Sequence, residues 1–173
     1  MLFAYIEVFL RPNWCNDMQA INYVAILGFA SSLNSVQENL AQETARKLAE
    51  KGLGVGVGNL SGTFDHALRS AKAHAGMTIA IVEQALSRKY HDDCDVLLVV
   101  SSQQEKHQAL SDQCCGAIVI GGGPGTQKLV DRFLDKGKKI VAIEGSGGIV
   151  PFELDQRVAL KPTVDLALEA LTA

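Results

Sequence analysis

Hydrophobic residues gather in short continuous runs, and the stretches between the runs carry apolar residues at helical spacing. The runs occupy 22–29, 53–57, 77–83, 95–102, 116–122 and 139–144. The intervening and final stretches, with apolar residues about one helical turn apart, are 35–52, 62–76, 104–113, 126–137 and 163–173. Buried strands that alternate with helices are typical of a parallel sheet covered on both faces. The pattern predicts a doubly wound α/β fold with a mostly parallel sheet.

The first twenty residues stand apart from this alternation. They begin apolar but carry Glu7, and they lack the basic segment of a secretory signal. They are also too short to span a bilayer. We therefore expect an N-terminal arm or extra strand at 1–20, a single domain at 21–173 and no membrane partner.

Three glycine-rich loops, at 28–34, 56–63 and 121–126, each follow a predicted strand and lead into a helix. Ligands of doubly wound sheets bind beyond the carboxyl ends of the strands. Glycine allows close approach of a ligand, and the N–H groups at a helix start attract anions. A phosphate or other anion is therefore expected there. The predicted binding residues are Gly28, Ser31, Ser32, Gly58, Asn59, Gly62, Thr63, Gly121, Gly122, Gly123, Gly125 and Thr126.

Two familiar phosphate motifs are missing from these loops. The third loop lacks the spacing of a P-loop, and neither of the first two contains G-x-G-x-x-G. An ordinary NAD site is therefore unsupported. The alternative interpretation is that the glycines only make tight strand-to-helix turns.

Composition narrows the class of protein. Hydrophobic residues make up 47% of the chain and charged residues 20%, which favours a folded protein over a disordered one. The net charge is −3 without a basic block, which argues against nucleic acid as a partner. The four cysteines do not resemble the framework of a small secreted protein, so a cytoplasmic location is expected.

Candidate catalytic groups are few. Asp65 and His66 begin a predicted helix beside the second loop and could serve as base and acid, and Lys106 is a third candidate. Asp65 is also a favourable anion in the first turn of a helix, which is the simpler interpretation.

Cysteine and metal chemistry have weaker support. Cys114 and Cys115 suit small core positions, although Lys106 and His107 could provide the positive setting that a thiolate needs. The segment 91–94 contains metal-ligand residue types, but no second cluster has metal spacing, so no metal site is predicted.

The segment 116–143 resembles the P-G-G-x-G-T region of the LOG family, within the SLOG superfamily of Rossmann-like domains. LOG proteins have long carried the label "possible lysine decarboxylase", and molybdenum-cofactor carriers belong to the same superfamily. The order of elements is similar over about residues 22–145. The resemblance implies a Rossmann-like domain with a phosphate-binding edge. It also implies a homodimer or higher homo-oligomer, with the helix at 62–76 near a two-fold interface.

The chain departs from the phosphoribohydrolase members of that family at their catalytic positions. Those members have Arg-Lys where this chain has Lys106 and His107, and a Glu where it has Leu129. Gly121 replaces the leading proline, and Asp65 replaces the last glycine of G-L-M-G. The segment Val57-Gly58-Asn59 lies where the family has three consecutive glycines. A leucine cannot stabilise an oxocarbenium-like centre as a carboxylate does, which argues against hydrolysis.

Three functions remain open from the sequence. The leading hypothesis is a non-hydrolytic carrier or sensor that binds a nucleotide-like, pterin-type or other phosphorylated small molecule. The second is a divergent phosphoribohydrolase that uses Asp65, His66 or Lys106 in place of the missing groups. The third is an interaction module whose glycine loops are vestigial.

Overall fold

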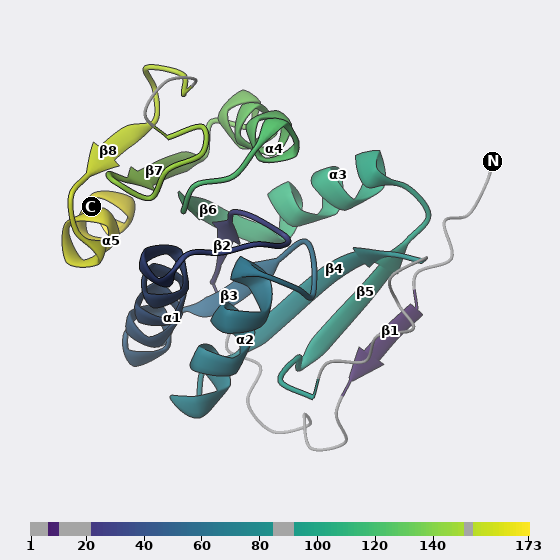
Figure 1. The fold of residues 1–173 in the computed structure, drawn as a ribbon. Coiled ribbons are helices and arrows are strands. Elements are labelled where there is room, and N and C mark those ends of the chain that lie inside the picture. The colour runs from purple at the N-terminus through teal and green to yellow at the C-terminus, as the bar shows by residue number, and fades with distance from the viewer. Residues whose placement is uncertain (1–6, 11–21, 85–91, 151–153) are drawn as a thin grey trace.

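The computed structural model describes residues 7–10, 22–84, 92–150 and 154–173 (Figure 1). Eight strands form one sheet in the order β1-β5-β4-β3-β2-β6-β7-β8. Strands β2 to β8 pair in parallel, which confirms the predicted α/β class with a mostly parallel sheet. The strands are β1 Glu7–Leu10, β2 Tyr23–Leu27, β3 Gly54–Val57, β4 Thr78–Glu83, β5 Val96–Val100, β6 Cys114–Val119, β7 Lys139–Ile143 and β8 Ala159–Lys161.

The N-terminal strand β1 lies at one edge of the sheet. Its backbone pairs antiparallel with β5, with Glu7 opposite Val99 and Leu10 opposite Val96. The rest of the predicted arm, at 1–6 and 11–20, lies outside the described residues, so the division at residue 20 stays a prediction. No described helix has the length and apolar character needed to cross a bilayer.

Helices cover both faces of the sheet (Figure 1). On one face lie α1 (Ser35–Glu50), α2 (Thr63–Ala73) and α5 (Val164–Thr172), and on the other lie α3 (Gln103–Gln113) and α4 (Pro124–Asp135). Strand β2 shows why both faces are apolar. Val24 and Ile26 pack on the side of α1, α2 and α5, whereas Ala25 and Leu27 pack on the side of α3 and α4. Because successive side chains of a strand point to opposite faces, its continuous apolar run fills both cores.

The helices differ in how they begin. Side-chain oxygens of Asn34, Ser102 and Thr163 cap α1, α3 and α5 by accepting hydrogen bonds from backbone N–H groups of the first turn. The N-cap residues of α2 and α4 are Gly62 and Gly123, which have no such side chain. The first-turn N–H groups of these two helices therefore depend on other partners.

The order of strands produces a switch point between β2 and β6. From β2 the chain adds β3, β4 and β5 on one side, and it then returns to place β6 on the other side of β2. The loops that follow β2 and β6 consequently diverge at the carboxyl edge of the sheet. Doubly wound folds bind ligands in the crevice that opens at such a point.

The start of α4 and the presence of β8 are two of the differences from the sequence-based prediction. Helix α4 begins at Pro124, two residues earlier than predicted, because proline is well suited to the first helical position. Gly125 therefore lies within the first turn of the helix rather than before it. The three-residue strand β8 was not predicted, since 159–161 is too short to give an apolar pattern.

Candidate functional site

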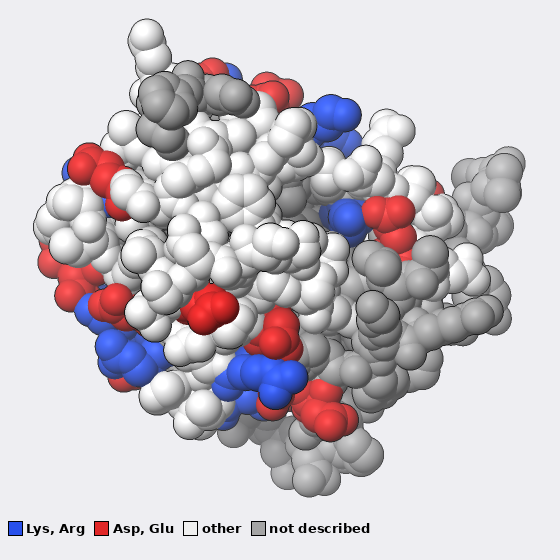
Figure 2. All heavy atoms as spheres, in the orientation of Figure 1, with Lys and Arg blue, Asp and Glu red and all other residues white. Residues whose placement is uncertain are grey.

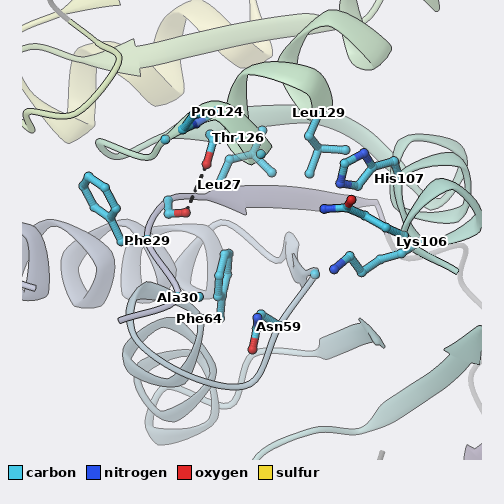
Figure 3. A pocket seen from close by; sticks show the side chains of 15 residues that line it. Leu27, Phe29, Ala30, Asn59, Phe64, Lys106, His107, Pro124, Thr126 and Leu129 are labelled. Atoms are coloured by element: carbon cyan, nitrogen blue, oxygen red, sulfur yellow. Dashed lines mark hydrogen bonds between the residues drawn. The ribbon is translucent and has the colours of Figure 1, made fainter. Parts of the chain in front are cut away.

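A cleft of about 260 Å³ lies at the switch point (Figure 3). Its wall comes from the end of β2 and the loop after it, the loop after β3, and helices α2, α3 and α4. The lining residues are Leu27, Gly28, Phe29, Ala30, Gly58, Asn59, Phe64, Gln103, Lys106, His107, Gly123, Pro124, Gly125, Thr126 and Leu129.

The first and third glycine loops meet at Gly28. Thr126 Oγ1 donates a hydrogen bond of 3.1 Å to the Gly28 carbonyl oxygen, drawn as a dashed line in Figure 3. A Cβ atom at Gly28 would lie 2.6 Å from Thr63 Oγ1 and 2.8 Å from the Ile120 carbonyl oxygen. These contacts leave no room for a side chain, so glycine is required here for packing of the loops.

The first turn of α4 opens onto the cleft. Gly123, the N-cap residue, has an extended backbone (φ −129°), and the first turn carries no acidic residue. A Cβ atom built at Gly123 or Gly125 would meet nothing within 4 Å. The first N–H groups of a helix lack intrahelical partners and carry the positive end of its dipole. An anion can therefore reach them through open space.

The turn before α4 depends on two other glycines. Gly121 and Gly122 have φ values of +65° and +95°, a region that side chains disfavour. Gly121 N donates to Ser146 Oγ at 2.9 Å, and Ile149 N donates to the Gly122 carbonyl at 3.1 Å. These two predicted site residues shape the loop and do not line the cleft.

A cationic side chain and a histidine come from α3. Lys106 Nζ lies 2.9 Å from Glu83 Oε1, and its side chain is 12% exposed. Burial lowers the pKa of His107 below its usual range, and the nearby charges of Lys106 and Arg132 lower it further. These effects favour the neutral form of His107. An added anion would favour its charged form.

Aromatic and amide groups line the other side of the cleft. In Figure 3, Phe29 and Phe64 lie across from Lys106 and His107, and Asn59 lies below Phe64. Asn59 Oδ1 already accepts hydrogen bonds from Leu60 N at 2.7 Å and from a serine hydroxyl of the same loop. The amide NH₂ group of Asn59 is therefore the part that can donate to a ligand.

The remaining predicted site residues lie outside the cleft. Ser31 and Ser32 are exposed in the first loop. Gly62 and Thr63 join the second loop to the first, with Thr63 N donating to the Phe29 carbonyl at 2.9 Å and Phe29 N donating to Thr63 Oγ1 at 3.1 Å. The cleft thus brings together Gly28, Gly58, Asn59, Gly123, Gly125 and Thr126 of the predicted set.

The structure does not bring the predicted acid–base candidates Asp65 and His66 to the cleft. Asp65 Oδ1 accepts from Arg69 Nε at 2.8 Å, and His66 Nδ1 lies 3.0 Å from Gln42 Nε2. Both contacts are on the surfaces of α1 and α2. Of the three candidates, Lys106 is the one that lines the cleft.

The cysteines do not form a reactive pair. Cys114 is the first residue of β6 and is buried, and burial raises the pKa of its thiol to about 12. Cys115, the next residue of the strand, is exposed. A thiol with a raised pKa is a poor nucleophile, which fits the interpretation of Cys114 as a core residue. His91, part of the segment considered for metal, lies outside the described residues.

Several cleft residues escaped the sequence-based prediction. Phe29, Phe64, Gln103 and Pro124 line the cleft but were not among the predicted site residues, although Phe29 and Pro124 lie within two of the glycine-rich loops. A signal existed for the α3 residues, since positions 103, 106 and 107 share one face of a helix by their spacing. No comparable signal existed for the two phenylalanines, because core aromatic residues have the same pattern.

Solved structures of similar fold include two proteins that handle molybdenum cofactor. The molybdenum cofactor binding protein from Rippkaea orientalis matches with a TM-score of 0.79 and 18% identity, covering 90% of this chain and 98% of that one. The molybdenum cofactor carrier protein from Chlamydomonas reinhardtii matches with a TM-score of 0.75 and 20% identity, covering 88% and 96%. At identities this low the likeness shows the fold alone.

A third structure corrects the exclusion of nucleic acid. DNA processing protein A from Helicobacter pylori, whose structure describes a single-stranded DNA binding mode, matches with a TM-score of 0.72 and 13% identity. The match covers 88% of this chain and 81% of that one. The prediction of no nucleic-acid partner was therefore wrong. Net charge and the lack of a basic block do not exclude such a partner for a protein of this fold.

The family is shown by the sequence itself. No curated protein matches the chain. A family model, described as the SLOG cluster4 family, matches residues 21–167, which is most of the chain. This match confirms the predicted SLOG resemblance. The chain belongs to the SLOG cluster4 family.

Proposed function

We propose that this protein binds a phosphorylated small molecule with a planar ring in the switch-point cleft and does not hydrolyse it. The observation that carries the proposal is the first turn of α4, which has no side-chain cap and faces the cleft through Gly123 and Gly125. The phosphate lies at this turn and accepts hydrogen bonds from its backbone N–H groups.

Charge in the cleft supports the same position for the phosphate. Lys106 Nζ lies in the cleft wall, where its ion pair with Glu83 fixes the ammonium group. No Asp or Glu belongs to the lining residues of the cleft. An anion therefore meets the helix N-terminus and the ammonium group of Lys106, whose charge Glu83 offsets in part from outside the lining of the cleft.

The ring of the ligand lies against the aromatic side of the cleft. Phe29 and Phe64 offer apolar faces, and a planar heterocycle gains stacking energy on such side chains. The amide NH₂ group of Asn59 can donate to a ring acceptor. Nucleobases and pterins share this chemistry, and the molybdenum-cofactor proteins of the same fold make a pterin-type ligand one of the two classes to test.

The absence of hydrolysis follows from Leu129. This residue lines the cleft at the position where the phosphoribohydrolases have Glu, and its side chain is 8% exposed. An alkyl side chain neither stabilises an oxocarbenium-like centre nor activates water. We expect no free base to be released from AMP above the rate without protein, measured by chromatography. Turnover at ordinary enzyme rates would contradict this part of the proposal.

A thermal-shift screen tests binding, because a ligand that binds only the native state raises the melting temperature. The compounds are AMP, ADP, a pterin phosphate and inorganic phosphate, with a single-stranded oligonucleotide alongside because DNA processing protein A shares the fold. We expect at least one ring-bearing phosphate to stabilise the protein more than inorganic phosphate does. Stabilisation by none of them, or by the oligonucleotide alone, would contradict the proposal.

The variant Gly123→Val locates the site. The extended backbone and the open space at Gly123 accept valine without strain, while its methyl groups occupy the space at the start of α4. We expect at least about a tenfold loss of affinity, because one charge-assisted hydrogen bond is worth that much. Ala73→Val, at an exposed position in the last turn of α2, is the matched control and should bind normally.

A further inference from the structure

A second hollow, of about 250 Å³, adjoins the cleft between α3 and α4. It is lined by Gln103, Gln104, His107, Lys128 and Arg132. Gln103 and His107 also line the cleft, so the two spaces share a wall. In Figure 2 the surface over the switch-point loops is mostly uncharged, and Lys and Arg atoms are visible where α3 and α4 approach each other.

Lys128 and Arg132 have no acidic ion-pair partner among the residues that the structure describes, whereas Lys136 of the same helix pairs with Asp112. Arg132 donates from Nη2 to the Gln108 side chain, and its Nε is buried with no hydrogen-bond partner in the described part of the chain. A buried donor without a partner is costly, so a shift of the Arg132 side chain that brings this N–H group to an acceptor would be favourable.

Helix geometry aligns the hollow with the phosphate position of the cleft. Gln103 and His107 are four residues apart on α3, and Lys128 and Arg132 are four apart on α4, so each pair shares a helix face. Thr126 and Arg132 are six residues apart, which is about 9 Å along the helix axis. Arg132 also lies about 120° around the helix from Thr126, and its long side chain leans back toward the first turn. The two places are joined by Gln103 and His107, which line both of them. One molecule can therefore reach both places.

We propose that the ligand of this protein carries more than one phosphate group, and that Lys128 and Arg132 bind the group beyond the one held at the start of α4. This inference rests on the proposed function, which supplies the first phosphate position. Arg132 can offer two N–H groups to a phosphate, and Lys128 adds a second positive charge. The chemical class is a di- or polyphosphate, including nucleoside diphosphates and triphosphates, in preference to a monophosphate.

His107 couples the two positions. Burial favours its neutral form, and so do the charged groups around it, Lys106, Arg132, Lys128 and Glu83, because cations predominate among them. A phosphate chain that passes its ring would reverse that balance and favour the imidazolium. Polyphosphate binding should therefore strengthen as the pH falls from 8 to 6, and His107→Gln should weaken that dependence.

The test uses inorganic phosphate and inorganic tripolyphosphate, because neither contains a ring. In thermal-shift titrations the wild-type protein should bind tripolyphosphate at least about tenfold more tightly than phosphate. Lys128→Gln with Arg132→Gln should lower the affinity for tripolyphosphate far more than the affinity for phosphate, so that most of this preference is lost. The matched control, Lys51→Gln with Lys161→Gln, removes the same charge away from the hollow and should retain the preference.

The outcomes separate this inference from the proposed function. If phosphate binds but tripolyphosphate gains nothing, or if the control pair lowers the preference as much as the Lys128 and Arg132 pair, the inference is overturned and the proposed function stands. If neither anion binds and the ring-bearing phosphates also fail, both are overturned. Lys128 is exposed, so Lys128→Gln alone should fold normally and lower the preference in part even if the Arg132 variant is unstable.

Discussion

Helices α2 and α4 begin in similar ways in the sequence and in different ways in the structure. Each follows a strand and a glycine-rich loop, and each has a glycine N-cap without a capping side chain. At α2, Thr63 N donates to the Phe29 carbonyl, and Asp65 lies in the first turn. At α4, the first turn carries no acid and faces the cleft through Gly123 and Gly125. The start of α2 is therefore occupied by contacts within the protein, and the start of α4 is accessible to a ligand.

Glycine has two separate structural roles in these loops. Gly62 has a φ of +61°, and a Cβ there would lie 2.5 Å from the Phe29 carbonyl oxygen. Gly123 has an extended backbone with nothing within 4 Å of its Cβ position. Glycine is therefore required at position 62 for close packing of two loops, whereas at position 123 it keeps space open beside the helix.

The largest expected effect comes from exchanging the two glycines for alanine. Gly62→Ala should lower the free energy of unfolding by about 3 kcal/mol, because it combines a strained backbone with a steric overlap. Gly123→Ala should lower it by less than about 1 kcal/mol. Urea denaturation of both variants measures the difference. Equal losses of stability would mean that the two helix starts are not distinct.

A smaller effect separates the two threonines of these helix starts. Thr63→Val removes the acceptor for Phe29 N, and leaving that N–H without a partner should cost about 2 kcal/mol of unfolding free energy. Thr126→Val removes the hydrogen bond to the Gly28 carbonyl, which should cost about 1 kcal/mol. Thr126→Val should lower ligand affinity more than Thr63→Val does, since Thr126 lines the cleft and Thr63 does not. A larger loss of affinity in the Thr63 variant would contradict the assignment.

The sequence predicted the fold well, and six of the residues predicted for the site line the candidate cleft. Continuous apolar strands such as 23–27 need both faces covered, and that requirement leaves few architectures. The position of the site followed from topology, because glycine loops after β2, β3 and β6 must meet at one edge. The role of each glycine could not be predicted, since it depends on which atoms of another loop come within contact distance. Gly62 and Gly123 are the same residue type in the sequence, and only their contacts in the folded protein distinguish them.

The smallest expected effect concerns pH. The pKa of His107 is lowered in the folded protein by burial and by Lys106 and Arg132, so the unfolded chain takes up that proton more readily. Stability from this group is therefore fully present above the ordinary histidine pKa of about 6.5 and declines as the pH falls below it. Melting temperatures measured from pH 8 to pH 5 should fall less in His107→Gln than in the wild type. If the melting temperatures of the two proteins fell equally, His107 would not contribute to the loss of stability at low pH.

The backbone amides at the starts of α2 and α4 can be compared in one experiment, which tests directly which of the two helices provides the anion site. In a ¹⁵N–¹H NMR titration with inorganic phosphate, the amides of Gly125 and Thr126 should shift and saturate together, because both residues line the cleft and lie in the first turn of α4. The amides of Thr63 and Phe64 should move little, since Thr63 N already donates to Phe29. Saturable shifts at Thr63 and Phe64 with none at Gly125 and Thr126 would contradict the central claim that α4, and not α2, provides the anion site.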